Sequence, residues 1–129
     1  MNTYIILMNP GTEESLRDKF RDEPDKITGI EGISMTELKI TINYNDQSLI
    51  GMIQHLPGVT SVMLESIVTS VKTILADNTD VIESGGIEYV ISVKRAPKAT
   101  DTFRVSVHYV NDAEGVFDVD INAKTVIPR

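Results

Sequence analysis

The chain has 129 residues, of which 41% are hydrophobic and 24% charged, and it carries a formal net charge of −7. This length suits one ordinary domain or two small lobes, and the apolar fraction is too high for a disordered tail. Because such an acidic surface repels phosphate backbones and anionic headgroups, we expect no nucleic acid and no membrane among the partners. The lack of cysteine excludes disulfides, thiolate nucleophiles and thiolate zinc sites.

The first elements are a strand, a helix and a weaker strand. A continuous apolar run at residues 4–8 is typical of a strand that is buried on both faces and therefore central in its sheet. Leu16 and Phe20 lie four residues apart among charged residues, which predicts a short helix with Thr12 as its cap. Residues 27–35 contain two glycines and predict a weak edge strand.

The same half continues with a strand, a helix and a strand. Apolar and polar residues alternate over residues 38–44, which predicts a half-buried strand. Residues 49–56 follow helical spacing until Pro57-Gly58, and residues 59–64 predict another strand. The order βαββαβ predicts a ferredoxin-like lobe over residues 1–65.

The other half, residues 66–129, predicts a second lobe in which a helix packs on an antiparallel sheet. The apolar face of this helix consists of Ile67, Val68, Val71, Ile74 and Leu75, and Ser66 is its expected cap. Alternation then predicts a three-stranded meander, in which one face of the first strand consists of Ile87, Tyr89, Ile91 and Val93, and the next strands centre on residues 103–109 and 117–121. The predicted fold class is therefore α+β.

Groups that carry chemistry are sparse in this sequence. The two histidines, His55 and His108, have no Cys, Asp or Glu at the usual ligand spacing in the sequence, so we expect both to be structural or solvated. No serine lies in a nucleophile motif, and no glycine-rich loop forms a phosphate cradle. We therefore expect no enzyme, no catalytic residue, no metal site and no cofactor.

One carboxylate pair leaves an alternative open. Asp118 and Asp120 project from the same face of a predicted strand, an arrangement that suits a bound cation. Alternation alone also produces this pair, because the solvent face of an edge strand is often charged. The sequence does not decide between the two interpretations.

The N-terminal half resembles the subtilisin-propeptide inhibitor family. The similarity covers residues 3 to 65, and its most telling stretch is Leu56-Pro57-Gly58-Val59-Thr60-Ser61-Val62. The resemblance implies that the sheet docks on a protease and that the segment after the fourth strand, here Met63, Leu64, Glu65 and Ser66, lies in the active-site cleft. The C-terminal half loosely resembles a PepSY-type unit through residues 103–107 and 117–125, and such units also occur in protease propeptides.

These observations predict a non-enzymatic protein–protein interaction module whose specific partner, by resemblance, is a subtilisin-type serine protease. The expected contacts are Met63, Leu64 and Glu65, together with an edge strand that carries Ile30, Ile33 and Met35. Two alternatives stay open: a structural subunit of a virion or other oligomeric particle, which would self-associate, and a small-ligand sensor of ACT type. No signal peptide or transmembrane segment is recognisable, so cytoplasmic residence is expected, with an extracellular or virion location as the alternative.

Overall fold

The structure is a computed structural model that describes residues 2–42, 47–82, 85–97 and 99–129. Within these residues it contains three α-helices and two four-stranded antiparallel sheets, which confirms the predicted α+β class. The internal contacts divide the chain into two compact units, Met1–Glu65 and Ser66–Arg129.

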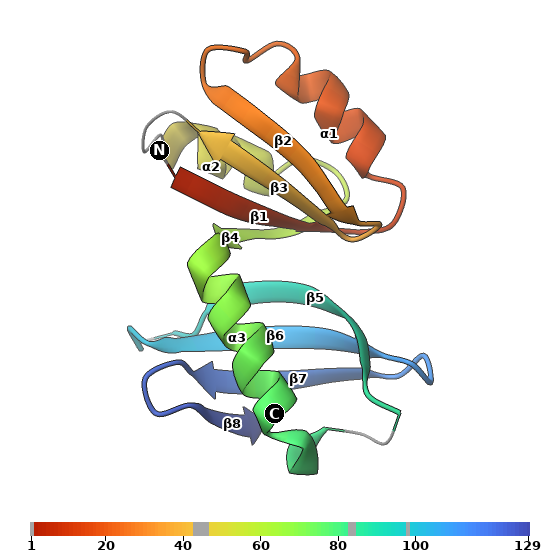
Figure 1. Ribbon diagram of the computed structural model, residues 1–129, viewed down its shortest axis with the longest axis vertical. Helices are drawn as coiled ribbons and strands as arrows, with labels where there is room; N and C mark the ends of the chain where they lie inside the picture. The colour runs from red at the N-terminus through yellow and green to blue at the C-terminus, as the bar shows by residue number, and fades with distance from the viewer. Residues whose placement is uncertain (1, 43–46, 83–84, 98) are drawn as a thin grey trace. The chain divides into compact units, whose positions relative to one another are not determined.

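The first unit contains four strands and two helices. They follow one another as β1 (Asn2–Met8), α1 (Glu13–Phe20), β2 (Ile27–Ser34), β3 (Glu37–Ile42), α2 (Gln47–Gln54) and β4 (Val59–Leu64). The spatial order of the strands is β2-β3-β1-β4, so β1 is central and β2 and β4 are the edges (Figure 1). The prediction that residues 38–44 form one strand extends to Tyr44, which lies outside the described residues.

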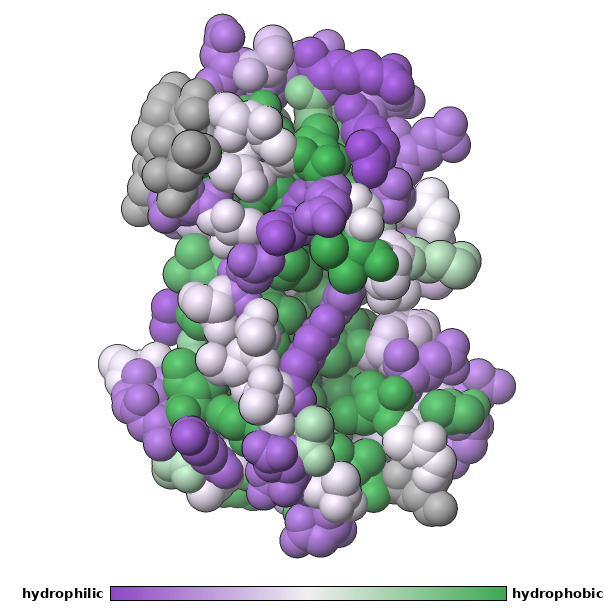
Figure 2. All heavy atoms as spheres, viewed as in Figure 1, coloured by the Kyte–Doolittle hydropathy of each residue, from purple (hydrophilic) through white to green (hydrophobic). Residues whose placement is uncertain are grey.

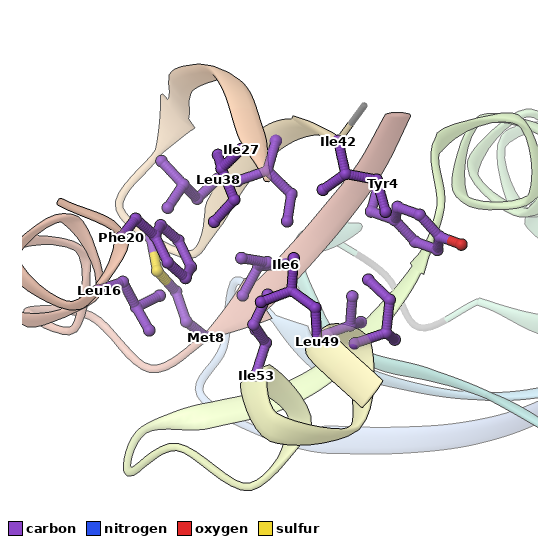
Figure 3. Close-up of a cluster of buried hydrophobic side chains, with 13 residues drawn as sticks. Tyr4, Ile6, Met8, Leu16, Phe20, Ile27, Leu38, Ile42, Leu49 and Ile53 are labelled. Atoms are coloured by element: carbon purple, nitrogen blue, oxygen red, sulfur yellow. The ribbon is translucent and has the colours of Figure 1, made fainter. Parts of the chain in front are cut away.

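Both helices of this unit pack on the same face of the sheet. Leu16 and Phe20 of α1 and Ile53 of α2 point toward sheet residues such as Ile6 and Leu38 (Figure 3). All five side chains are buried, whereas hydrophilic side chains cover the outer surface of α1 (Figure 2). The four-residue spacing on α1 and the alternation on the strands therefore produce one closed apolar core.

The strand β1 is buried on both of its faces, as the apolar run predicts. Tyr4, Ile6 and Met8 belong to the helix-facing core, while Ile5 and Leu7 are buried on the opposite face. Burial of both faces explains why the run has no polar alternation, because β3, which also lies between two strands, still carries the half-buried Lys39 and Thr41.

Thr12 occupies the N-cap position of α1, as predicted, but it does not cap the helix with its side chain. Its hydroxyl makes no cap hydrogen bond, and Ser15 Oγ instead donates to the Thr12 carbonyl oxygen at 2.9 Å. The Thr12 side chain packs against Gly58, where an added Cβ would lie 2.8 Å from Thr12 Cγ2. Gly58 has φ +86°, and the turn after α2 therefore needs glycine for two reasons, its backbone angle and this close approach.

The second unit contains α3 (Glu65–Asp77), a short 3₁₀ helix η1 (Thr79–Val81) and a sheet of four strands. These strands lie side by side in chain order: β5 (Ile87–Arg95), β6 (Thr102–Tyr109), β7 (Glu114–Asp120) and β8 (Thr125–Pro128). The predicted three-stranded meander is therefore wrong by one strand. The four residues of β8 are too few for a recognisable alternation, and they end in a proline, which is tolerated at a sheet edge.

The predicted face of β5 is wrong in part, because this strand contains two irregularities: of Ile87, Tyr89, Ile91 and Val93, only Val93 is buried. The register with β6 shifts between Ile87 and Tyr89 and again between Val90 and Ser92, and each shift adds one residue to β5 alone. Each extra residue reverses the alternation. Consequently Val90 and Val93 are buried, whereas Tyr89 is only half-buried.

The helix α3 lies across one face of this sheet (Figure 1). It begins at Glu65, so Ser66 lies inside its first turn and the prediction of Ser66 as the cap is wrong. Its buried side chains are Val68, Val71, Ile74 and Leu75, in agreement with the predicted apolar face. Even α3, with 13 residues, falls short of a membrane crossing, and no other helix in the described part of the chain reaches the length and apolar character required.

Candidate functional site

The first group of predicted contact residues lies on the β2–β3 hairpin. Ile30 pairs with Ile40 and packs partly against the core of the first unit. Ile33 is near the end of β2 with 48% of its surface exposed, and Met35, in the two-residue turn that follows, is 72% exposed. Two of the three residues therefore offer apolar surface to a partner, while Ile30 supports the core.

The second group lies on β4 and at the start of α3. Leu64 pairs with Tyr4 and packs partly against the core, whereas Met63 pairs with Ile5 on the opposite face of the sheet. Glu65 is the first residue of α3. These three residues belong to ordered elements and do not form an extended segment that is free to enter a cleft.

An ion-pair network also holds Glu65 in place. Lys39 Nζ lies 3.0 Å from Glu65 Oε2 and 3.7 Å from Glu31 Oε2, so one ammonium group connects β2 to the start of α3. The hydrogen bond to Glu65 and the nearby charges of Glu65 and Glu31 raise the pKa of Lys39 above its ordinary value. Release of Glu65 into a partner's cleft would leave this ammonium group with a single, more distant carboxylate.

The two groups do not form one patch. The hairpin group lies at the β2 edge and the Met63–Glu65 group at the β4 edge, with β3 and β1 between them. Three strand spacings separate these edges by about 14 Å. A partner that uses both groups must therefore span the sheet.

The β2 edge is poorly suited to accept an added strand. Its register with β3 shifts between Ile27 and Gly29 and between Gly32 and Ser34. Bulges and charged residues on an edge strand are devices that prevent edge-to-edge pairing. We therefore expect side chains of the hairpin, and not backbone groups of β2, to make contact with a partner.

His108 has two carboxylates beside its ring, contrary to the expectation from sequence spacing. His108 Nδ1 lies 3.5 Å from Glu88 Oε2, and His108 Nε2 lies 3.6 Å from Asp112 Oδ1. The ring of His108 stacks on Tyr89 with the centroids 4.8 Å apart and the planes at 9°. Sequence reasoning missed this cluster.

Local geometry explains why the cluster was missed. The register shift in β5 adds Glu88 to the strand next to Tyr89, the pairing partner of His108, so both residues reach the same ring. Asp112 returns to His108 because the chain turns directly after β6, with Asp112 at φ +68°. The only sequence signal for the cluster is the four-residue interval between His108 and Asp112, which carries no meaning until the turn is known.

Both residues of the pair Asp118 and Asp120 accept hydrogen bonds from protein groups. Asp118 is buried, and its carboxylate accepts from Arg104 Nε at 3.0 Å and from Arg129 Nε at 2.7 Å. Asp120 Oδ1 accepts from the backbone N–H groups of Asn122 and Ala123. The structure therefore favours a structural role for this pair, the alternative that sequence alternation already offered.

The charges around Asp118 change its titration. The hydrogen bond from Arg104 is the main cause of a lowered pKa for Asp118; the hydrogen bond from Arg129 and both guanidinium charges add to it, and desolvation opposes it. The same pairing raises the pKa of Arg104. Two guanidinium groups on one carboxylate leave it no electrostatic need for a metal ion.

Comparison with known proteins finds no family model, no curated protein and no solved structure that matches this chain.

Proposed function

We propose that this protein is a non-enzymatic protein–protein interaction module that docks through the β2–β3 hairpin. The observation that carries this proposal is the exposure of Met35 and Ile33, 72% and 48%, which lie two residues apart, whereas Met52, the other exposed large apolar residue described in this unit, lies on α2 and is 42% exposed. Exposed apolar side chains of this size at a hairpin turn are suited to fill a pocket on a partner. The net charge of −7 favours a partner whose docking surface is basic.

We propose further that the first unit is a ferredoxin-like lobe and that its partner is a subtilisin-type serine protease. The element order βαββαβ and the strand order β2-β3-β1-β4 support the fold. The sequence resemblance over residues 3–65 supports the partner. The two supports are independent, because one depends on topology and the other on the Leu56–Val62 stretch.

The docking mode we propose leaves the active site of the protease free. Leu64 packs partly against the core, and Glu65 is held by Lys39, so the segment after β4 stays in place on its own sheet. The hairpin lies at the other edge of the sheet and carries the more exposed apolar side chains. Binding then occurs beside the cleft and not inside it.

A binding assay against a panel of subtilisin-type proteases tests this proposal. We expect equal affinity for the free enzyme and for the enzyme whose active-site serine is covalently blocked. We also expect the double variant Ile33→Lys/Met35→Lys to bind at least about tenfold more weakly, because loss of a buried apolar anchor costs more than 1 kcal/mol. The matched control is Val110→Lys/Ile127→Lys, which makes the same chemical change at two exposed residues of the second unit.

Each outcome of this assay decides something. Absence of binding across the panel contradicts the protease as partner. Binding that is lost when the active-site serine is blocked contradicts the proposed mode and favours insertion of residues 63–65 in the cleft. Equal weakening in both double variants shows that added positive charge, and not the hairpin, is responsible.

A second candidate function is that of a subunit in a larger assembly. Ile127 on the edge strand β8 is 58% exposed, and a second copy of the chain would cover it. Static light scattering across a concentration range tests this candidate. A constant monomer mass contradicts it, and a mass that grows in the native chain but not in Ile127→Lys supports it.

A further inference from the structure

We infer that Met35 is a site of reversible oxidation, where a peroxide converts the apolar tip of the β2–β3 hairpin into a polar one. Met35 is 72% exposed, whereas Met52 is 42% exposed, Met63 is half-buried and Met8 is 2% exposed. Peroxides oxidise methionine to its sulfoxide, and accessible sulfur atoms react first. Among the methionines that the structure describes, Met35 therefore offers the most accessible side chain.

The hairpin turn holds Met35 in this exposed position. Thr36, the next residue, is 5% exposed, and its carbonyl oxygen accepts a hydrogen bond from the N–H of Met8 at 3.0 Å. The N–H of Thr36 donates to Ser34 Oγ at 3.3 Å, so hydrogen bonds link the residues on both sides of Met35. The exposure of Met35 is thus built into the turn, because Thr36 is tied to the central strand β1.

The composition of the chain leaves no thiol to intercept a peroxide. Cysteine thiolates are the usual sulfur targets of peroxides, and this chain has no cysteine. The thioether of methionine carries no ionisable proton, so its oxidation does not depend on a neighbouring base. Oxidation of Met35 therefore requires only contact with the oxidant.

The reaction transfers one oxygen atom from hydrogen peroxide to the sulfur of Met35. A sulfur lone pair attacks one peroxide oxygen, so the S–O bond forms as the O–O bond breaks. The departing oxygen keeps its hydrogen, takes the proton of the transferred oxygen and leaves as water. The sulfur loses two electrons and the peroxide gains two, and a methionine sulfoxide reductase can reverse the change.

Oxidation would remove the apolar character of the docking surface and leave the fold intact. The sulfoxide is polar, so its burial in an apolar pocket of a partner carries a desolvation cost that the thioether does not. In the free chain the new oxygen stays in water, while Met8, which lies in the core, is shielded from the oxidant. Release of a partner on oxidation rests on the proposed docking function, whereas selective oxidation of Met35 does not.

Peptide mapping of the full chain after treatment with hydrogen peroxide tests the site. Trypsin cleaves after Lys26 and Lys39, and the peptide of residues 27–39 contains Met35 as its only methionine. We expect Met35 to gain one oxygen about twofold faster than Met52 and at least about tenfold faster than Met8. Oxidation of Met35 that is no faster than that of Met52 overturns the inference.

Retention on a hydrophobic column under native conditions tests the change of surface. Peroxide should shorten the retention time of the native chain and of the control Met52→Leu, and should shorten that of Met35→Leu much less. Leucine has about the volume of methionine and contains no sulfur, so both variants keep their apolar surface after treatment. An equal shift in Met35→Leu overturns the assignment of the change to Met35.

A binding assay with a subtilisin-type protease that binds the native chain tests the consequence for docking. We expect peroxide to weaken binding of the native chain and of Met52→Leu at least about tenfold and to leave that of Met35→Leu unchanged. Treatment with a methionine sulfoxide reductase and dithiothreitol should restore the affinity of the native chain. Equal weakening in Met35→Leu, or no weakening in the native chain, contradicts control of docking by Met35. If no protease of the panel binds, the proposed function fails, while the peptide map and the retention times still decide whether Met35 is the oxidised site.

Discussion

Asp118 is the most strongly engaged charged residue of the second unit. Its side chain is 7% exposed and lies between Arg104, its cross-strand partner on β6, and Arg129. A carboxylate in this position gains three charge-assisted hydrogen bonds from two guanidinium groups, both of which keep contact with water. The two guanidinium groups thus offset the desolvation of the Asp118 carboxylate, which is the condition under which a buried charge is tolerated.

The first prediction concerns this residue. Asp118→Asn retains the shape of the side chain and removes its charge, so we expect a loss of about 1–2 kcal/mol in the free energy of unfolding at neutral pH. Urea titration followed by circular dichroism measures this loss. The control Asp18→Asn breaks an exposed pair with Arg21 and should change stability little.

The same variant also predicts a pH dependence. The pKa of Asp118 in the folded state lies below its ordinary value of 3.8, so the folded chain binds fewer protons here than the unfolded chain. The contribution of Asp118 to the free energy of unfolding is complete at pH values above its ordinary pKa. It is lost as the pH falls through the lower pKa of the folded state. The difference in the free energy of unfolding between the native chain and Asp118→Asn should therefore shrink as the pH falls from about 5 to about 2. A difference that stays constant over this range contradicts the assignment.

At the scale of elements, the turn between α2 and β4 offers a sharp test of packing. Gly58 has φ +86°, and its missing Cβ leaves the space that Thr12 fills; Gly11 has a similar φ of +89°, but nothing lies within 4 Å of its added Cβ. We expect Gly11→Ala to cost about 1–2 kcal/mol from backbone strain alone, and Gly58→Ala to cost about twice as much because overlap is added.

The double variant Gly58→Ala/Thr12→Ala separates the two contributions. Removal of the Thr12 methyl and hydroxyl groups makes room for the new Cβ, so the double variant should lose less stability than the sum of its single variants. Chemical denaturation of the native chain, of Gly58→Ala, of Thr12→Ala and of the double variant measures this coupling. Strict additivity would show that overlap with Thr12 contributes nothing to the cost.

The elements also show how far sequence reasoning reaches. The helices and the first sheet follow from local patterns: Leu16 and Phe20 repeat at the helical period, and the unbroken apolar run 4–8 is typical of a strand that is buried on both faces. The buried face of β5 did not follow, since its two register shifts depend on pairing with β6. A bulge depends on how two strands pair, so it cannot be predicted from the residues of one strand alone.

The candidate sites divide in the same way, into features that depend on local sequence and features that depend on strand pairing. Ile33 and Met35 could be named from sequence as residues of a glycine-bearing edge strand, but their exposure at the end of β2 and in the turn after it follows only from the structure. The cluster at His108 could not, because a bulge on β5 and a turn after β6 assemble it. Side chains that meet only through pairing and turns carry no signature at a fixed spacing.

At the scale of the whole molecule, the net charge of −7 governs how copies of the chain meet. Like charges repel at neutral pH and low salt, which opposes self-association through the exposed apolar residues. We expect the second virial coefficient from static light scattering to be positive there and to fall as salt is added or as the pH approaches the sequence pI near 4.7. A coefficient that is insensitive to both would show that charge does not control encounters between copies.

The two extra residues of β5 also affect how the sequence of this protein should be aligned with that of a homologue. Each adds a position to one strand and none to its neighbour, so a homologue with a regular strand here would be two residues shorter within an element. An alignment that permits gaps only in loops would then shift Glu88 and Tyr89 out of register with His108, and the contact of these residues with the histidine could not be read from the aligned positions.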